Sequence, residues 1–283
     1  MSPRRLRLDA ELVRRGLARS REHACELIHA GRVQVNKQGA TKPAMQVAID
    51  ADLVVRGDVS DQGYASRGGY KLQGALDSFL PLGLVVADRR CLDAGASTGG
   101  FTDVLLRNGV AQVVAVDVGY GQLAWPLRQD PRVQIHDRTN IRDISTELIA
   151  GPVDLVVGDL SFISLRLVLD ALIGVTAPGA DLVLMVKPQF EVGKERLGKG
   201  GVVRDADLRI AAIEGVVSAA GQLGWGAKSV CVSPLPGPSG NVEYFVWLVQ
   251  GNDQLPDGLI TQVVHAGPEG AKTGSAQHND TSG

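Results

Sequence analysis

The chain has 283 residues, which favours about two domains, and a formal net charge of −2. Its 44% hydrophobic and 21% charged residues are typical of a folded globular protein and exclude a mostly disordered chain. No apolar stretch approaches the ~18 residues of a membrane-spanning helix, and the basic N-terminus lacks the apolar core of a secretory signal.

The first 60 residues are basic, with 11 Lys and Arg against 7 Asp and Glu, whereas residues 251–283 carry a net charge of −3. A basic cluster attracts phosphate backbones, although a solvated basic surface would have the same composition. Apolar spacing and turn residues predict helices at 8–15 and 20–31, then strands at 32–36 and 47–55. We therefore expect a small α+β domain at residues 1–58, followed by a polar linker at 59–68.

From residue 69 to 250 the sequence alternates between helical and strand-like segments. The expected helices are 69–79, 99–108, 165–175 and 206–223, and the expected strands are 90–94, 112–117, 133–135, 153–159, 180–187, 228–233 and 242–249. This alternation predicts a mostly parallel α/β sheet covered on both faces. Only eight residues join the last two strands, too few for a helical crossover, so the seventh strand should run antiparallel. Such a Rossmann-like sheet is typical of class I methyltransferases, although other nucleotide-binding sheets fit the spacing.

The remaining residues, 251–283, are rich in Gly, Asp, Thr and Ser. This composition predicts a disordered tail.

A glycine-rich loop, DAGASTGGFTD at residues 93–103, follows a buried strand and opens a helix. Its small residues let the backbone approach a ligand, and the amides at the helix start can bind a negatively charged group. The spacing G-x-x-x-G-G differs from the dinucleotide pattern G-x-G-x-x-G. Asp117 ends the next strand, where an acid can accept hydrogen bonds from ribose hydroxyls. The combination favours S-adenosylmethionine over NAD, while a tight turn beside a surface acid is the alternative.

Charged residues stand where several predicted strands meet one edge of the sheet. Asp159 and Lys187 each end an apolar strand, and Glu243 begins the antiparallel one. Lys71, in the helix before the first strand, can reach the same side. Strand ends are often solvated, so each residue alone has an ordinary explanation. Together, a lysine facing two carboxylates can orient a ribose hydroxyl and help its proton leave as a methyl group arrives.

Missing motifs narrow the chemistry further. No NPPY or DPPY follows the fourth strand, as an amino-directed methyltransferase would need, and no cysteine ends that strand, as a carbon-directed cytosine enzyme would need. Oxygen is therefore the better target. Cys25, Cys91 and Cys231 lie far apart without a CxxC pair, which argues against a disulfide framework or a metal site and predicts a cytoplasmic protein.

Residues 7–36, with the elements RLD, SR-x-x-A and I-x-x-G-x-V-x-VN, resemble the S4-type RNA-binding domain. The motifs SRGGYKL, LDAGASTGGFTD, VVGDLSFISL, VKPQFEVG and GNVEYF resemble the TlyA family of rRNA 2′-O-methyltransferases. That family is related to FtsJ/RrmJ-type ribose methyltransferases, which use a Lys-Asp-Lys-Glu tetrad. The resemblance places the tetrad on Lys71, Asp159, Lys187 and Glu243, with Lys187 acting on the 2′-hydroxyl.

The resemblance also implies ligands and partners. It implies an S-adenosylmethionine pocket formed by Asp93, Gly95, Ala96, Ser97, Thr98, Gly99, Gly100, Phe101, Asp117 and, at the adenine, Asn140. It implies RNA contacts by Arg4, Arg5, Arg7, Arg19, Arg21 and Arg32. The implied substrates are cytidines in 16S and 23S ribosomal RNA of the 30S and 50S subunits, with an influence on susceptibility to capreomycin-type antibiotics. The basic N-terminus favours this dual-target kind over members that methylate 23S RNA alone.

Three other functions stay open from the sequence. The chain could be a non-catalytic RNA-binding factor for ribosome assembly, although an intact tetrad argues against that role. It could be a haemolysin, a name this family has carried, although no long apolar or basic amphipathic helix supports lysis. It could also be a small-molecule methyltransferase with an appended module.

Overall fold

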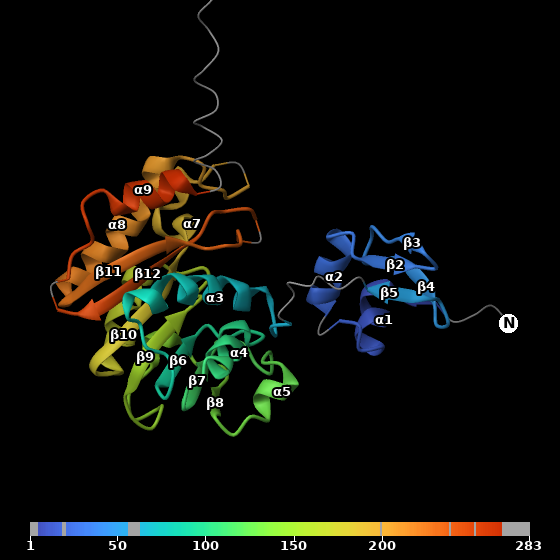
Figure 1. Ribbon diagram of the computed structural model, residues 1–283, viewed down its shortest axis with the longest axis horizontal. Coiled ribbons are helices and arrows are strands. Elements are labelled where there is room, and N and C mark those ends of the chain that lie inside the picture. Colours follow the sequence, from blue (N-terminus) through green and yellow to red (C-terminus); the bar gives the residue numbers. More distant parts are fainter. Residues whose placement is uncertain are drawn as a thin grey trace, which may run out of the picture. The chain divides into compact units, whose positions relative to one another are not determined.

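The computed structural model describes residues 5–18, 21–55, 63–198, 200–237, 239–251 and 253–267, with the backbone alone for Lys194. The chain forms two compact units, Met1–Ser66 and Arg67–Gly283 (Figure 1). Part of the predicted linker at 59–68 lies outside the described residues. Its last two residues, Arg67 and Gly68, are not linker, because they already belong to the first helix of the second unit.

The first unit is a small α+β fold. Its elements are β1 (Arg5–Arg7), α1 (Leu8–Arg14), α2 (Arg21–His29), β2 (Val33–Val35), β3 (Gln38–Gly39), β4 (Gln46–Ala48) and β5 (Leu53–Val55). β2 lies between β3 and β5 in an antiparallel sheet, and β1, which the sequence analysis did not predict, pairs with β4. Leu8 and Leu12 of α1 pack with Leu27 and Ile28 of α2 in one buried core, because their helical spacing places them on facing sides.

The second unit is built on a seven-stranded sheet. Its strands are β6 (Arg90–Ala94), β7 (Gln112–Val116), β8 (Val133–His136), β9 (Val153–Gly158), β10 (Thr176–Val186), β11 (Trp225–Val232) and β12 (Tyr244–Gln250). Their order across the sheet is β11-β12-β10-β9-β6-β7-β8. β12 runs antiparallel to both neighbours, while β10, β9, β6, β7 and β8 pair in parallel. The predicted class I, mostly parallel sheet with an antiparallel seventh strand is confirmed.

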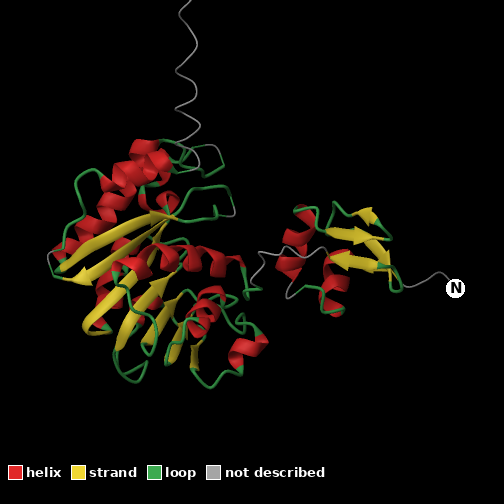
Figure 2. Cartoon of the chain, viewed as in Figure 1, coloured by secondary structure: helices red, strands yellow, loops and turns green. Residues whose placement is uncertain are grey.

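Helices cover both faces of this sheet (Figure 2). They are α3 (Arg67–Phe79), η1 (Leu80–Leu82), α4 (Gly100–Arg107), α5 (Trp125–Arg128), η2 (Ile141–Asp143), η3 (Leu165–Leu167), α6 (Leu169–Gly174), α7 (Pro188–Glu191), η4 (Lys194–Arg196), α8 (Ala206–Gln222) and α9 (Leu259–Ala266). Successive residues of β12 face opposite sides, as strand geometry requires. Val246 shares a buried core with Val216 of α8, whereas the Trp247 ring lies 5.7 Å from that of Phe79 in α3.

The prediction of a disordered tail at residues 251–283 is wrong for the first part of this segment. α9 packs against α8 and β11, and its Val264 is fully buried. The segment LITQVVHA is apolar on one face, but averaging over a polar 33-residue tail concealed it. Residues 268–283 lie outside the described part of the chain. Neither α9 nor any other helix among the described residues is long and apolar enough to cross a membrane.

Candidate active site

The register of the sheet brings the predicted tetrad to one edge. Val186, the last residue of β10, pairs with Tyr244, the first residue of β12, so Lys187 and Glu243 lie on the same side of that pair. β9 runs parallel to β10, and Asp159 directly follows it. The carboxyl ends of parallel strands form the usual ligand-binding edge of an α/β sheet.

The four side chains form two ion pairs at this edge. Lys187 Nζ lies 2.6 Å from Asp159 Oδ1. Lys71 Nζ, from α3, donates to Glu243 Oε2 at 2.5 Å. Both lysines and Glu243 are buried, and Asp159 is partly exposed. Each lysine is therefore held beside a carboxylate in a site where little water screens the charges.

Ser161 is a further contact of Lys187 that sequence analysis missed. Lys187 Nζ donates to Ser161 Oγ at 2.8 Å, so the segment after β9 holds this nitrogen at two points. Both contacts keep the amine at the sheet edge, where it can face a substrate oxygen. The only sequence signal was the position of Ser161, two residues after Asp159.

Phe162 follows directly and presents an aromatic ring to solvent. Its side chain is 92% exposed, and its φ of +64° is a conformation that bulky residues rarely adopt. The ring centroid lies 5.4 Å from that of Phe190 in α7, the helix that begins right after Lys187. Strained backbone of this kind is concentrated at functional sites. Nothing in the sequence distinguishes Phe162 from a core phenylalanine.

The glycine-rich loop between β6 and α4 has the tight geometry predicted for it. Gly95 and Gly99 have φ of +85° and +98°. A Cβ on Gly95 would lie 3.0 Å from the Asp159 carbonyl oxygen, and one on Gly99 would lie 2.3 Å from Leu127 Cδ1. Only glycine fits at these positions, so the loop packs closely against the Asp159 strand end and against Leu127.

Asp117 fixes the other side of this loop. Its carboxylate accepts hydrogen bonds from the Ser97 amide at 2.8 Å and the Gly119 amide at 2.7 Å. The Thr139 amide donates to the Asp117 carbonyl, which brings the neighbouring Asn140 close. Asn140 Oδ1 accepts from the Arg142 amide and so caps η2. The structure thus gathers the predicted cofactor residues of three strand ends around one loop.

Asp93 lies beneath the loop and is fully buried. Burial raises the pKa of Asp93 to about 7, although a 2.6 Å hydrogen bond from the Thr102 hydroxyl to Oδ2 opposes this. Asp93 Oδ1 has no hydrogen-bond partner among the described residues. A buried carboxylate at the end of β6 therefore ties that strand to α4 from inside the loop.

In the first unit, the arginines implied in RNA binding are partly engaged by acids. Arg7 donates to the buried Asp9 through Nε and Nη2, at 3.1 and 2.9 Å, and Arg21 donates to it at 2.9 Å. The Arg7 hydrogen bond is the main reason that the pKa of Asp9 is well below its usual range. Arg5 is exposed on β1. Arg4 and Arg19 lie outside the described residues, and Arg32 is partly buried.

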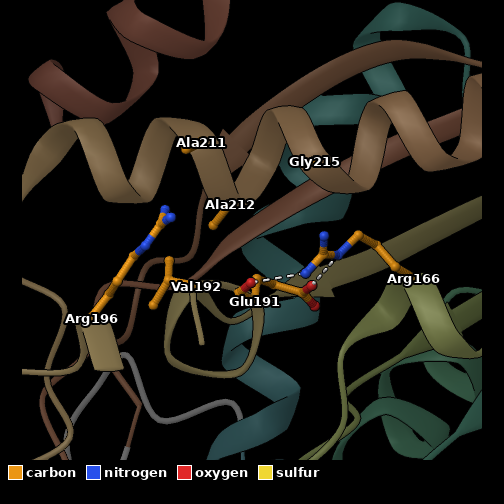
Figure 3. Close-up of a pocket in the computed structure, with 7 residues that line it drawn as sticks. All are labelled: Arg166, Glu191, Val192, Arg196, Ala211, Ala212 and Gly215. Atoms are coloured by element: carbon orange, nitrogen blue, oxygen red, sulfur yellow. Dashed lines mark hydrogen bonds and ion pairs between the residues drawn. The ribbon is translucent and has the colours of Figure 1, made fainter. Parts of the chain in front are cut away.

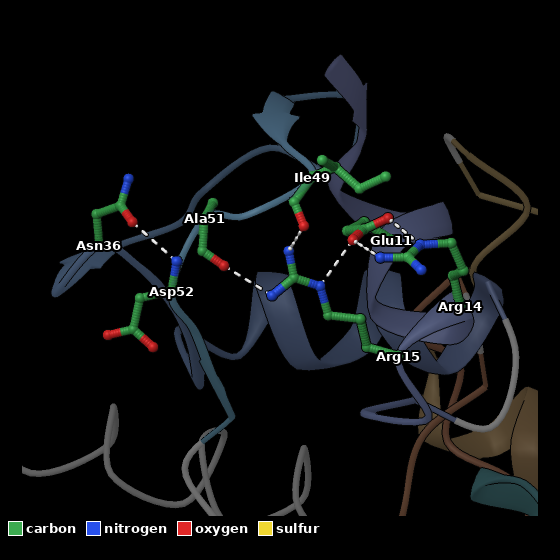
Figure 4. Close-up of polar contacts among 7 residues, drawn as sticks. All are labelled: Glu11, Arg14, Arg15, Asn36, Ile49, Ala51 and Asp52. Atoms are coloured by element: carbon green, nitrogen blue, oxygen red, sulfur yellow. Dashed lines mark hydrogen bonds and ion pairs between the residues drawn. The ribbon is translucent and has the colours of Figure 1, made fainter. Parts of the chain in front are cut away.

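A second buried acid, Glu11, organises two arginines that were not among those predicted (Figure 4). Arg14 donates to it at 2.7 and 2.6 Å, and Arg15 at 2.7 Å. Arg15 also donates to the carbonyls of Ala51 and Ile49, so it links α1 to the segment before β5. The Arg14 hydrogen bond, helped by Arg15 and opposed by burial, lowers the pKa of Glu11 to about 2.

Comparison with known proteins identifies the family of each unit. The FtsJ-like methyltransferase family model matches residues 64–250, and the S4 domain model matches residues 6–53. A solved structure from Streptococcus thermophilus, described as a candidate hemolysin, is 37% identical with a TM-score of 0.75, and the match covers 96% of this chain and 98% of that one.

Two curated relatives carry enzyme names. One from Mycobacterium tuberculosis, named 16S/23S rRNA (cytidine-2′-O)-methyltransferase TlyA, is 58% identical over 89% of this chain and 92% of its own. One from Campylobacter jejuni, named 23S rRNA (cytidine-2′-O)-methyltransferase TlyA, is 34% identical over 68% of this chain and 74% of its own. The chain therefore belongs to the TlyA family of FtsJ-like methyltransferases.

Proposed function

We propose that this enzyme transfers a methyl group from S-adenosylmethionine to the ribose 2′-oxygen of cytidines in 16S and 23S ribosomal RNA. The observation that carries the proposal is the pair of lysine–carboxylate contacts at the sheet edge, beside the glycine loop. The choice of substrate rests on the 58% identical relative, whose name gives both 16S and 23S rRNA. This substrate also argues for action in the cytoplasm on 30S and 50S subunits.

S-adenosylmethionine, when bound, supplies an electrophilic methyl group on its sulfonium sulfur. The residues that would hold it are those of the glycine loop and Asp117. The glycines at positions 95 and 99 let the loop turn tightly between β6 and α4, which suits a close approach by the ligand. The Asp117 carboxylate suits ribose hydroxyls, and the segment that carries Asn140 suits the adenine.

Lys187 is the residue we assign to the substrate oxygen. Asp159 and Ser161 fix its amine at the sheet edge, where an N–H can donate a hydrogen bond to the 2′-oxygen. This contact orients the hydroxyl and stabilises the negative charge that develops on its oxygen. The partly exposed Asp159 carboxylate would accept the hydroxyl proton as the new C–O bond forms and the methyl–sulfur bond of the donor breaks. Lys71 and Glu243 form the second pair, which connects α3 to the start of β12 at the same edge of the sheet.

The first unit is proposed to bind ribosomal RNA. The match to the S4 domain model and the arginines of β1, α1 and α2 support this role. Asp9 and Glu11 hold four of these guanidinium groups in fixed positions. A preorganised arginine loses less conformational entropy when it contacts a phosphate.

Methyl transfer to purified subunits tests the proposal. Unmethylated 30S and 50S subunits are incubated with the full chain and labelled S-adenosylmethionine, and the RNA is then hydrolysed in alkali. A 2′-O-methyl group blocks scission at its site, so we expect label in alkali-resistant dinucleotides from both subunits. Label in bases, or in neither subunit, would contradict the proposal, and label in 50S alone would remove the 16S substrate.

A further inference from the structure

A pocket of about 250 Å³ lies beside the site described above, and the methyl-transfer proposal does not use it. Its lining residues are Arg166, Glu191, Val192, Arg196, Ala211, Ala212 and Gly215. Arg166 and Arg196 extend into it from opposite sides, and the small residues of α8 form its roof (Figure 3). Two arginines and one glutamate give the lining a net charge of +1.

Arg166 is held in place by the buried Glu191. Its Nε lies 3.3 Å from Glu191 Oε2, and its Nη2 donates to the Glu191 carbonyl at 3.0 Å. Glu191 also accepts from the Ser164 hydroxyl at 2.5 Å and the Leu165 amide at 2.7 Å. One guanidinium of the pocket is therefore fixed before any ligand arrives.

Arg196 has the opposite character. It is exposed in η4, and its side chain makes no hydrogen bond or ion pair with the described residues. A guanidinium beside a cavity presents N–H donors in a planar fork that matches the oxygens of a phosphate. The pocket thus combines one fixed cation with one that is free to close on an anion.

The pocket is connected to the tetrad by a series of contacts between two adjacent segments. These segments follow β9 and β10, and their paired residues are Asp159 and Ser161 with Lys187, Phe162 with Phe190, and Ser164, Leu165 and Arg166 with Glu191. Glu191 ends α7, four residues after Lys187, which is roughly 6 Å along a helix axis. An RNA strand whose ribose lies at Lys187 can therefore place one of its nearby phosphates at Arg166.

We propose that this pocket binds a backbone phosphate of the RNA substrate, close to the ribose that is methylated. The inference rests on the proposed function, because it takes the RNA strand at Lys187 as given. Arg166 and Arg196 each donate to the phosphate oxygens, and Ala211, Ala212 and Gly215 leave the space that the phosphate occupies. Fixing a phosphate on one side of the ribose also fixes the direction in which the 2′-oxygen points.

Salt dependence of RNA binding tests this site directly. Each phosphate contact contributes about 0.7–0.9 to the slope of log affinity against log salt concentration. The full chain and its Arg196→Gln variant are titrated with unmethylated 50S subunits between 50 and 200 mM salt. We expect about tenfold weaker binding at the lowest salt, as for a lost hydrogen bond to a charged group. We also expect the slope to become shallower by about 0.7–0.9, which is the contribution of one phosphate contact.

Arg107→Gln is the matched control for loss of charge. Arg107 is the last residue of α4 and lies where the chain turns back toward β7, at the opposite edge of the sheet. Its variant should keep the wild-type slope. Equal slopes for wild type, Arg196→Gln and Arg107→Gln would overturn the proposal, as would an equal decrease in both variants.

A second pair of variants adds charge instead of removing it. Ala211→Glu introduces a carboxylate at the exposed rim of the pocket, and Ser218→Glu introduces the same charge two turns along α8. Only Ala211→Glu should weaken binding, about tenfold, and an equal effect of both would count against the site.

Methyl transfer is measured in parallel. A wild-type chain that binds subunits without methylating them would refute the proposed function, while the comparison of slopes would still decide the phosphate site.

Discussion

Glu243 is the most constrained single residue of the site. It is 1% exposed, its Oε2 accepts from Lys71, and its Oε1 has no hydrogen-bond partner among the described residues. Gly237 packs so closely that a Cβ there would lie 2.5 Å from Oε1. A carboxylate this deeply buried depends on its lysine, because removal of one partner leaves an uncompensated charge.

Lys71→Met should therefore destabilise the second unit by about 3–5 kcal/mol. The double variant Lys71→Met/Glu243→Gln removes both charges and should recover most of this loss, while methyl transfer should stay low in both proteins. Chemical denaturation and a methyl-transfer assay measure the two effects separately. Recovery of activity in the double variant would show that the pair has only a structural role.

Phe162, unlike Glu243, should contribute little to stability and more to methyl transfer. Because its ring is exposed, Phe162→Ala should change the free energy of unfolding by less than about 0.5 kcal/mol. If the ring stacks on a base of the bound RNA, methyl transfer should fall by about tenfold or more, since such stacking contributes about 1–3 kcal/mol per base. Leu82→Ala, at another exposed apolar residue, is the control. Equal rates for the two variants would exclude a stacking role.

At the scale of elements, periodicity predicted the regular structure well where one face is buried. β6 matches its predicted residues 90–94, and α8 ends one residue before the predicted end. The sequence did not predict β1 and α9. β1 has only three residues, too few for a pattern, and α9 lies in a segment whose average composition is polar. Both elements depend on tertiary partners, β4 for β1 and α8 for α9.

α1 is the element whose stability should depend most clearly on pH. The pKa of Glu11 is about 2 in the folded chain and near 4.5 when unfolded. A lowered pKa means that the ion pairs stabilise the fold above pH 4.5 and that this stability is lost as the pH falls from 4.5 toward 2.

Glu11→Gln should therefore lower the amide hydrogen-exchange protection of α1 at pH 6, and the difference from wild type should shrink below pH 4.5. Glu22→Gln, at an exposed acid of α2, provides the comparison and should have little effect at any pH. A difference between wild type and Glu11→Gln that stays constant from pH 6 to pH 3 would contradict this account of the ion pairs.

At the scale of the whole molecule, the chain combines a unit that matches the S4 model with a unit that matches the methyltransferase model. Asp159, Lys187 and Glu243 could be placed at one edge because topology brings the strand ends together there, whereas Lys71 of α3 was assigned from the resemblance to the TlyA family. Ser161, Phe162 and the Glu191 network could not, because they depend on how the segments after β9 and β10 pack together. Loop packing of that kind has no periodic signal in a sequence.

Lys187 is the residue that we propose acts on the substrate oxygen in the chemical step. Single-turnover methyl transfer to unmethylated 50S subunits, with saturating S-adenosylmethionine and enzyme in excess, measures that step apart from binding. We predict that Lys187→Ala lowers the rate constant by about 10²–10³-fold, as for other residues that stabilise a developing oxyanion, while its affinity for S-adenosylmethionine stays close to that of wild type. A Lys187→Ala enzyme that transfers the methyl group at the wild-type rate would show that Lys187 does not act on the substrate oxygen.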